Sequence, residues 1–254
     1  MISKAKLKEL SAYKTAKMCD QEQVFVVEGT KMVQEALSSD FEVETICALE
    51  EWFIENRTLV RKKINPENTF EVTNAELERI SGMKTPNQVW MLVKRKTFTV
   101  NISDDRMTLV LDKIQDPGNM GTIIRTCDWF GIRNIVCSPD TVNCYNPKVV
   151  QSTMGGIFRT NIEYADLAPL LDECHKENIP IYGGILGGEN IYRSELSKQK
   201  GILVIGNESK GISAEIADKI THRLMIPNIG HTCESLNASV ATAILLSEFC
   251  RSEE

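Results

Sequence analysis

This chain of 254 residues lacks several features, and each absence excludes a class of protein. No apolar run is long enough to span a bilayer, so no transmembrane helix is expected. Glycine and proline number only 15 and 8, which excludes a collagen-like chain and argues against disorder. With 42% hydrophobic and 25% charged residues, the composition is that of an ordinary globular protein large enough to bury its own core.

The eight cysteines also lack a pattern. They contain no C-x-x-C pair and no regular spacing, so neither a zinc ribbon nor a disulfide framework is indicated. The first residues have no apolar segment followed by a small-residue cleavage site, as a secretory signal would have. We therefore expect reduced thiols and a cytoplasmic location.

Positive charge is scarce overall, because the formal net charge is -6. Such a balance argues against a chain that coats nucleic acid uniformly. Residues 1–100 are nonetheless neutral, with 15 basic and 15 acidic side chains, and the first 17 residues carry five lysines against one acid, Glu9. A basic first helix is more often a solvated face than an anion-binding element, but phosphate binding needs only a local basic face, so the acidic balance does not exclude nucleic acid.

A polar connection around residues 94–106 divides the chain. Before it, short β-rich runs alternate with segments of helical period, and Thr73 and Glu76 have capping-box spacing. The runs cover residues 24–27, 45–49 and 89–93. These features predict a small α/β domain at 1–94, a linker at 95–105 and a second domain at 106–254.

The second domain is expected to hold a parallel sheet. Its apolar runs do not alternate with polar residues and are separated by helical segments, which is typical of strands buried on both faces. The runs cover residues 108–111, 134–137, 179–182, 202–205 and 223–226. In such α/β folds, ligands bind at the carboxyl edge of the sheet.

The first polar loop at that edge follows residue 111. Asn119 is expected to cap the helix that comes next, and Arg125 lies within its first two turns. An arginine there can hold a phosphate or carboxylate near the helix N-terminus. A capped helix with an ordinary surface arginine explains the pattern equally well.

The second loop covers residues 206–213 and is rich in glycine and polar residues. It is not a phosphate-binding P-loop, because Ile212 stands where that motif needs lysine. The glycines at 183–188 also lack the register of a dinucleotide-binding fingerprint. The glycines in both segments either let the backbone approach a ligand or make turns.

The third loop runs from Ile226 into a C-terminal helix, and Ser235 and Asn237 are both good cap residues for it. Apolar residues recur along this helix at i, i+4 and i+8, which predicts a core stripe or a subunit interface. They are Leu236, Val240 and Ile244.

His231 has no second histidine or acid at ligand spacing, so we interpret it as a loop histidine and expect no metal site. Ser235 has no histidine and aspartate in motif context, so a hydrolase triad is not supported.

These three loops, in this order, resemble the signature motifs of the SpoU (TrmH) family of RNA ribose 2′-O-methyltransferases, within the SPOUT superfamily. The resemblance covers about residues 106 to 250, with Ala238 where a valine is common and Cys233 in a variable loop. The matching residues are Asn119 and Arg125 in the first motif, Gly206, Asn207, Glu208 and Gly211 in the second, and Ile226, Pro227 and 235–241 in the third.

Residues 24–29 and the helix after them resemble the ribosomal-protein-like substrate-binding domain that many members carry. Membership of the family implies a deep trefoil knot in the C-terminal domain, an exception to unknotted topology. It also implies a homodimer in which both chains build each site.

The resemblance implies methyl transfer from S-adenosyl-L-methionine to a ribose 2′-OH, without a metal. It places the cofactor against Gly206, Ile226 and Leu236, with Gly184 as a further wall. It makes Arg125 the general base. Because a guanidinium is hard to deprotonate, binding the adjacent phosphate is an equally physical role. The supporting residues, which would orient Arg125 and the ribose or hold the loops, are Asn119, Glu208, Ser235 and Asn237, with Glu208 the expected partner of Arg125.

The 2′-OH restricts the substrate to RNA. The separate N-terminal domain favours ribosomal RNA over transfer RNA, and removing residues 1–94 is expected to weaken RNA binding more than cofactor binding. The alternatives are a tRNA 2′-O-methyltransferase and a noncatalytic RNA-binding assembly factor with the same fold. A knotted methyltransferase acting on a base, or a nucleotide-binding oxidoreductase, is less favoured.

Overall fold

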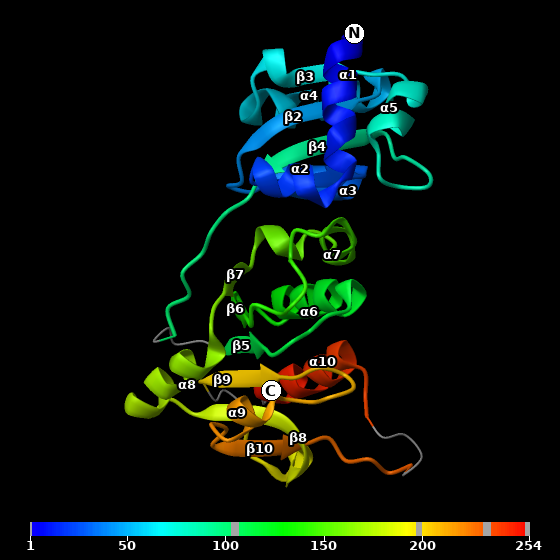
Figure 1. The fold of residues 1–254 in the computed structure, drawn as a ribbon. Coiled ribbons are helices and arrows are strands. Elements are labelled where there is room, and N and C mark those ends of the chain that lie inside the picture. Colours follow the sequence, from blue (N-terminus) through cyan, green and yellow to red (C-terminus); the bar gives the residue numbers. More distant parts are fainter. Residues whose placement is uncertain (1, 103–106, 197–199, 231–234, 252–254) are drawn as a thin grey trace. The chain divides into compact units, whose positions relative to one another are not determined.

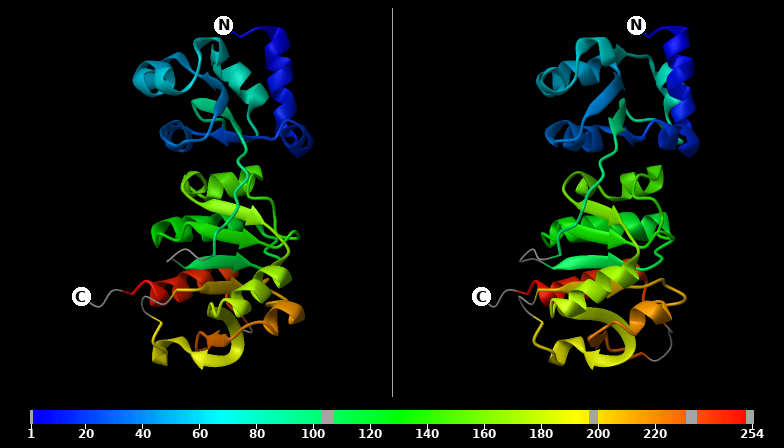
Figure 2. Two further views of the ribbon diagram at one scale, coloured as in Figure 1. Left: turned by 90° about the vertical axis from the view of Figure 1, so that its left-hand side faces the viewer. Right: turned by 60° about the vertical axis from the view of Figure 1, so that its left-hand side comes forward.

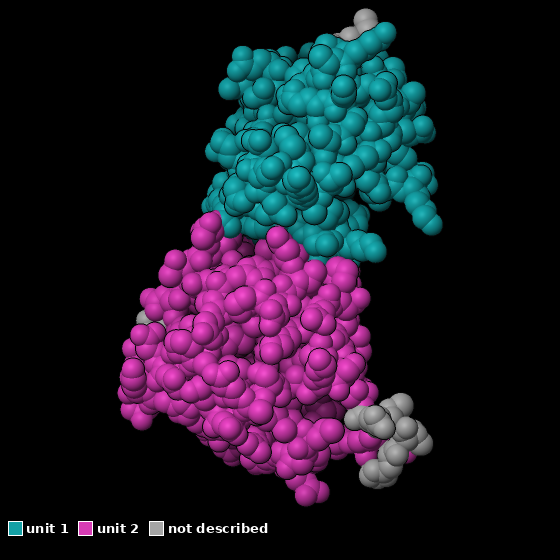
Figure 3. Space-filling view, viewed as in Figure 1, with its two compact units in different colours: residues 1–96, 145–158 teal, residues 97–144, 159–254 magenta. Residues whose placement is uncertain are grey.

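The computed structural model describes residues 2–102, 107–196, 200–230 and 235–251. The chain forms two compact units, shown in different colours in Figure 3. Unit 1 comprises Met1–Lys96 and Tyr145–Phe158, and unit 2 comprises Thr97–Cys144 and Arg159–Glu254. Among the described residues, no helix is long and apolar enough to cross a bilayer.

Unit 1 contains a four-stranded sheet of order β1-β4-β2-β3 (Figure 1). The central strand β4 is antiparallel to both neighbours, with Leu92 opposite Val26 of β1, and β3 is parallel to β2. The three predicted strands are present; β3 was not predicted, because a strand of three residues shows no period. The strands are β1 (Val24–Glu28), β2 (Val43–Ala48), β3 (Thr69–Glu71) and β4 (Val89–Lys94).

Helices cover both faces of this sheet (Figure 2). On one face, α1 and α5 pack against Val24 and Val26, whose side chains share one side of the alternating strand. The predicted capping box between Thr73 and Glu76 begins α5. The helices of residues 2–96 are α1 (Lys4–Ser11), η1 (Ala12–Lys14), α2 (Ala16–Gln21), α3 (Thr30–Ser38), α4 (Glu50–Lys63), η2 (Pro66–Asn68) and α5 (Asn74–Ile80).

Residues 145–158 also belong to unit 1, although they follow β6 of the other unit in the chain. They form α7 (Pro147–Ser152) and η3 (Gly156–Phe158). The ring of Tyr145 lies 4.6 Å from that of Phe25, and Phe158 packs edge-on against Phe41 at 5.4 Å. Apolar contact thus places this segment in the core of unit 1, which the division of the sequence at 95–105 does not foresee.

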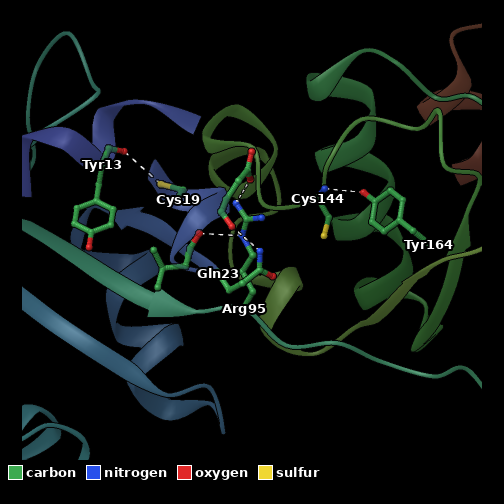
Figure 4. Close-up of polar contacts among 8 residues, drawn as sticks. Tyr13, Cys19, Gln23, Arg95, Cys144 and Tyr164 are labelled. Atoms are coloured by element: carbon green, nitrogen blue, oxygen red, sulfur yellow. Dashed lines mark hydrogen bonds and ion pairs between the residues drawn. The ribbon is translucent and has the colours of Figure 1, made fainter. Parts of the chain in front are cut away.

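The chain leaves β4 at Arg95, whose contacts hold it to the start of β1 (Figure 4). Its N–H donates to Gln23 O at 2.8 Å, and its Nε donates to Val24 O at 2.9 Å. Its guanidinium also pairs with Asp20 at 2.7 Å.

In unit 2, the N–H of Cys144 donates to the Tyr164 hydroxyl at 2.7 Å (Figure 4).

Unit 2 contains the predicted parallel sheet, with six strands in the order β10-β8-β9-β5-β6-β7. The edge strand β7 was not predicted, because only Ile162 of its four residues is buried. At the other edge, β10 exposes His222 and Arg223, so it is not buried on both faces as expected. The strands are β5 (Thr108–Leu111), β6 (Asn134–Cys137), β7 (Asn161–Tyr164), β8 (Ile181–Asn190), β9 (Ile202–Ile205) and β10 (His222–Met225).

Helices lie on both faces of this sheet as well (Figures 1 and 2). On one face, α8 and α9 cover a core that includes Val110, Val136 and Val204. On the other, α6 and α10 pack together. The helices are α6 (Pro117–Trp129), α8 (Leu167–Lys176), η4 (Ile191–Arg193), α9 (Ala214–Ala217) and α10 (Ala238–Phe249).

Candidate functional site

The three polar loops singled out in the sequence follow β5, β9 and β10 in unit 2. Strand β9 lies between β5 and β8, and β10 is paired to β8. Because all these strands are parallel, their carboxyl ends share one edge of the sheet. The fold therefore gathers the three loops at the place where α/β proteins bind ligands.

The first of these loops enters α6 through Asp116, and not through Asn119 as the sequence suggested. Asp116 Oδ1 accepts the N–H of Asn119 at 2.7 Å, and Pro117 occupies the first helical position. Proline suits that position because its nitrogen has no hydrogen to satisfy, which places the cap on the residue before it. Asn119 therefore lies in the first turn, with its side chain available for other contacts.

The Asn119 carboxamide connects three loops. Its Nδ2 donates to Glu208 Oε1 in the loop after β9, and its Oδ1 accepts from Asn237 Nδ2 at 2.8 Å. Since one end of the amide donates and the other accepts, the two partners define its orientation. These contacts, which we call the Asn119 network, join residues 89 and 118 positions away in the chain.

Asn237 also caps α10, as predicted. Its Oδ1 accepts the backbone N–H groups of Ser239 and Val240 at 3.0 and 3.3 Å. The other predicted cap residue, Ser235, instead donates its hydroxyl to the carbonyl of Glu208 at 3.3 Å. Both residues of the third motif thus contribute to holding α10 beside the loop after β9.

The loop after β9 is closed by its own backbone. The N–H and C=O groups of Asn207 and Gly211 bond to one another at 3.0 and 2.8 Å. A Cβ on Gly206 would lie 2.3 Å from the carbonyl carbon of Gly211, so no larger residue fits there without a shift. The absence of a side chain on Gly206 thus lets its backbone pack closely against that of Gly211. Of the two roles considered for this glycine, ligand approach and turn formation, the contact corresponds to turn formation.

Two further contacts attach this loop to the end of β5. Asn207 Nδ2 donates to the carbonyl of Lys113 at 3.0 Å, and Asp112 Oδ2 accepts the N–H of Ser213 at 2.6 Å. Asp112 is only 2% exposed. Asp112 was not among the predicted site residues, although an acid directly after a buried apolar strand is the signal that would have indicated it.

Arg125 lies apart from the Asn119 network. It is exposed on α6, and it forms no ion pair with Glu208 or with any other residue in the described part of the chain. The expected pairing of Arg125 with Glu208 is therefore wrong for this structure, where Asn119 binds the carboxylate. Six positions separate Asn119 from Arg125, which directs their side chains to different sides of the helix.

The four residues expected to contact the cofactor lie near the same sheet edge. Gly206 follows β9, Ile226 follows β10, and Leu236 precedes α10 with 47% of its surface exposed. Gly184 lies within its strand, because β8 continues to Asn190, beyond the apolar run predicted at 179–182. Pairing of β8 with β9 stops at residue 183, and pairing with β10 is interrupted between 183 and 189, so Gly184 lies in a bulge.

This edge carries features suited to a nucleoside. Leu236 before α10, Leu186 in the bulge of β8 and Ile229 after β10 are exposed apolar side chains. Apolar contact combined with a few backbone hydrogen-bonding groups is what small-molecule sites supply. Leu186 and Ile229 were not predicted, because isolated apolar residues in loops carry no periodic signal.

The apolar stripe of α10 is not in the core. Val240 is 46% exposed and Ile244 partly so, and on the neighbouring α6 Trp129 is 85% exposed. Apolar residues that remain exposed in a row are typical of an interaction surface.

His231 and Cys233 lie outside the described residues. Within the described ranges, no group of acidic, histidine or cysteine side chains is arranged to hold a metal ion.

Comparison with known families gives two matches that divide the chain. The profile of the SpoU rRNA Methylase family matches residues 106–247, and that of the MRM3-like substrate binding domain matches residues 4–90. The first match contains all three loops at the sheet edge, and the second contains β1, β2, β3 and the first two residues of β4.

Individual relatives match nearly the whole chain. The 23S rRNA (guanosine(2553)-2′-O)-methyltransferase RlmP of Bacillus subtilis is 29% identical over 95% of this chain and 94% of its own. A structure from Porphyromonas gingivalis assigned to the TrmH family of RNA methyltransferases is 34% identical, with a TM-score of 0.85 and 98% of each chain covered. An AdoMet-bound rRNA methyltransferase from Sinorhizobium meliloti shares the fold, with a TM-score of 0.83 at 24% identity over 98% of this chain and 95% of its own.

Proposed function

The chain belongs to the SpoU rRNA methylase family, and from this we propose that it methylates a ribose 2′-hydroxyl of ribosomal RNA, using S-adenosyl-L-methionine. The observation that carries the proposal is the Asn119 network, which joins the three loops bearing the family's motifs. Ribosomal RNA is favoured because RlmP, which matches along almost the entire chain, is named for that substrate.

S-adenosyl-L-methionine, when bound, supplies a methyl group on a positively charged sulfur that is open to in-line displacement. The residues that would hold it are Gly206, Ile226, Leu236 and Gly184. Leu236 presents an exposed apolar side chain suited to the adenine, and the backbone at Gly206 and Ile226 offers hydrogen-bonding groups at the ends of two strands. Gly184, in the bulge of β8, would form a wall of this site.

Arg125 acts on the RNA. A guanidinium keeps its proton in proteins, so we assign Arg125 the binding of the phosphate beside the target ribose and the stabilisation of negative charge on the 2′-oxygen. The absence of an ion pair with any described residue leaves its charge available for an RNA phosphate. The general-base role implied by the family resemblance would require Arg125 to lose that charge.

Asn119, Glu208, Ser235 and Asn237 are positioning residues in this proposal. Their hydrogen bonds connect the start of α6, the loop after β9 and the start of α10. A set of groups already held in place costs little reorganisation when the reactants bind, and it favours the geometry needed for in-line attack.

We also propose a homodimer and a trefoil knot for unit 2. The exposed apolar row on α10 and Trp129 on α6 support the dimer. Support for the knot comes from the C-terminal segment, which leaves the edge strand β10, bonds to the loop after β9 and then packs as α10 on α6. A dimer would allow Arg125 of one protomer to complete the site of its partner.

The test is to incubate the protein with labelled S-adenosyl-L-methionine and unmodified ribosomal or transfer RNA, then map 2′-O-methylated positions. We expect label in ribosomal RNA, at a 2′-oxygen, and none with Arg125→Ala. Label confined to transfer RNA would favour the tRNA alternative, and a methylated base would contradict ribose as the target. RNA binding without any methyl transfer would favour the noncatalytic assembly factor.

A further inference from the structure

Unit 1 carries a groove of about 580 Å³ bordered by basic side chains from three different elements. Lys6 comes from α1, residues 61–63 from the end of α4, and Lys94 from the end of β4. The lining residues are Lys6, Glu42, Val43, Glu44, Thr45, Arg61, Lys62, Lys63, Ile64, Asn65, Asn68 and Lys94. We call this feature the α4 groove.

The cations of the α4 groove exceed its acids. Glu42 and Glu44 both pair with Lys94, at 2.6 and 3.9 Å. Lys63 donates to the backbone carbonyl of Ser39 and also lies near Asp40, a carboxylate that is paired with Lys96. Arg61 and Lys62 are exposed and form no ion pair with other described residues. Two positive charges at the end of α4 therefore lack an ion pair with described residues, and Lys63 shares Asp40 with Lys96.

The dipole of α4 explains part of this arrangement, because cations are favoured near a helix C-terminus. It does not explain why Lys6 and Lys94, from α1 and β4, border the same groove. Their ion pairs, with Glu9 for Lys6 and with Glu42 and Glu44 for Lys94, lie close to the surface, where such pairs stabilise a protein little and exchange partners readily. The ion pairs of this cluster therefore add little to the stability of unit 1, so stability alone does not explain why these cations lie together.

The chemistry of the lining indicates which part of a nucleic acid it fits. No aromatic side chain borders the groove, and its two apolar residues, Val43 and Ile64, are buried. A base would have no ring on which to stack. Lysine, arginine, asparagine and threonine side chains are instead the groups that contact phosphate and sugar.

We propose that the α4 groove binds the phosphodiester backbone of the RNA substrate and supplies sequence-independent affinity to the enzyme. This inference rests on the proposed function for the identity of the ligand. It also accounts for RNA binding by a chain of net charge -6, because the contact is confined to one local surface.

The test uses the full chain with Arg61→Glu and Lys62→Glu combined, since both residues are exposed and unpaired within the described structure. The matched control combines Arg57→Glu on α4 with Arg79→Glu on α5; both are exposed and lie outside the groove. RNA affinity is measured by filter binding to unmodified ribosomal RNA between 50 and 200 mM salt, a range over which the electrostatic screening length falls from ~14 Å to ~7 Å. Thermal unfolding of both variants is measured as well, to check that each is folded.

We expect the groove variant to bind RNA about tenfold more weakly, with a salt dependence smaller by about one unit of slope per lost phosphate contact. The KM for RNA should rise while kcat and S-adenosyl-L-methionine affinity stay within about twofold of wild type. The control should match the wild type.

Equal RNA affinity and salt slope in the groove variant would overturn the inference, as would a groove that binds inorganic phosphate but not RNA. Failure of the groove proposal can be distinguished from failure of the proposed methyltransferase activity. A wild-type protein that methylates no RNA but loses RNA affinity on groove substitution would refute the activity and support the groove. A wild-type protein that methylates RNA, together with a groove variant that binds RNA as well as the wild type, would support the activity and refute the groove.

Discussion

At the scale of single residues, Asn119 has the largest structural role in the candidate site. Its amide links Glu208 and Asn237, which lie in loops after two other strands. The sequence placed Asn119 in a motif but assigned it a capping role that Asp116 performs. The side chain is therefore free to hold the loops, and its two contacts explain why an amide, with one donor end and one acceptor end, suits this position.

We predict that Asn119→Ala lowers kcat for methyl transfer by about tenfold or more, which corresponds to ~1.4 kcal/mol in the barrier. Both loop partners lose a hydrogen bond, so the free energy of unfolding should fall by ~1–2 kcal/mol. Urea unfolding and turnover at saturating S-adenosyl-L-methionine measure the two effects. Gln115→Ala, an exposed residue of the same segment, is the control; equal behaviour of the two variants would contradict the positioning role.

Arg125→Ala should abolish methyl transfer while leaving the melting temperature and cofactor affinity unchanged. The side chain is exposed and forms no ion pair with described residues, so its loss costs the fold little. Isothermal titration with S-adenosyl-L-methionine measures the cofactor affinity, and the methylation assay measures the loss of activity. Arg133→Ala, at another exposed arginine of unit 2, should remain active. An active Arg125→Ala enzyme would exclude the assigned role.

Glu28 predicts a pH dependence of stability in unit 1. Burial raises the pKa of this carboxyl above its ordinary value of 4.5, although hydrogen bonds from Ser81 and Gly82 oppose the shift. The folded state thus holds the proton more tightly than the unfolded state. The associated stability is complete below the unfolded pKa and is lost as pH rises through the higher folded pKa.

Glu28→Gln keeps a neutral side chain at every pH, so its unfolding free energy should not show that decline. Urea unfolding from about pH 4 to pH 8 compares the two proteins over the window set by the raised pKa. Glu78→Gln, an exposed glutamate of α5, should retain the wild-type profile. A decline of the same size in Glu28→Gln would show that another group is responsible.

At the scale of elements, the start of α10 combines a structural and a functional contact in one residue. The oxygen of the Asn237 amide caps the helix, while its nitrogen donates to Asn119. The cap was predictable from the sequence, because a cap depends on residues two and three positions away. The bond to Asn119 was not, because it joins residues 118 positions apart.

Substitutions at Asn237 should separate these contacts. Asn237→Asp keeps an oxygen that accepts from the helix N–H groups but loses the donor to Asn119, whereas Asn237→Ala loses both. We expect both variants to lose activity, and Asn237→Ala to be less stable than Asn237→Asp by ~1 kcal/mol. Thermal unfolding and turnover assays test this; equal stability of the two variants would show that the cap contributes little.

Strands were predicted well where their side chains are buried throughout, and poorly where they bury few side chains. The central strands β5, β6 and β9 are buried throughout and mostly apolar, because helices cover both faces of the sheet. The edge strand β7 and the short β3 bury few side chains, so they leave no apolar run in the sequence. The bulge in β8 depends on its pairing with β10, which local sequence does not encode.

At the scale of the whole molecule, the two units share the chain in an interleaved order. Residues 145–158 follow β6 of unit 2 but pack with Phe25 and Phe41 of unit 1. Deleting residues 1–94 would therefore remove the apolar partners of Tyr145 and Phe158 as well as any RNA contact. Substitutions in the α4 groove separate RNA binding from this loss of packing, and for that reason they are the cleaner test of the role of unit 1.

The exposed apolar row of α10 leads to a prediction about assembly. Val240→Asp should shift a dimer toward monomer, because a carboxylate would have to be desolvated in the interface. Ser247→Asp, also exposed on α10, is the control. Sedimentation equilibrium measures the change, and methyl transfer should fall with the dimer fraction if both protomers build each site. A wild-type protein that is monomeric at micromolar concentration would refute the homodimer.

The sequence by itself determined the α/β class, the parallel sheet of unit 2 and the three loops, because apolar runs and polar loop residues are local features. The tertiary structure decided which side chains meet: Asn119 with Glu208 and Asn237, and Arg125 with none of them. It also decided that residues 145–158 join unit 1 and that cations from α1, α4 and β4 border one groove. These contacts join residues far apart in the chain, and they form only when strand order and helix packing bring distant segments together.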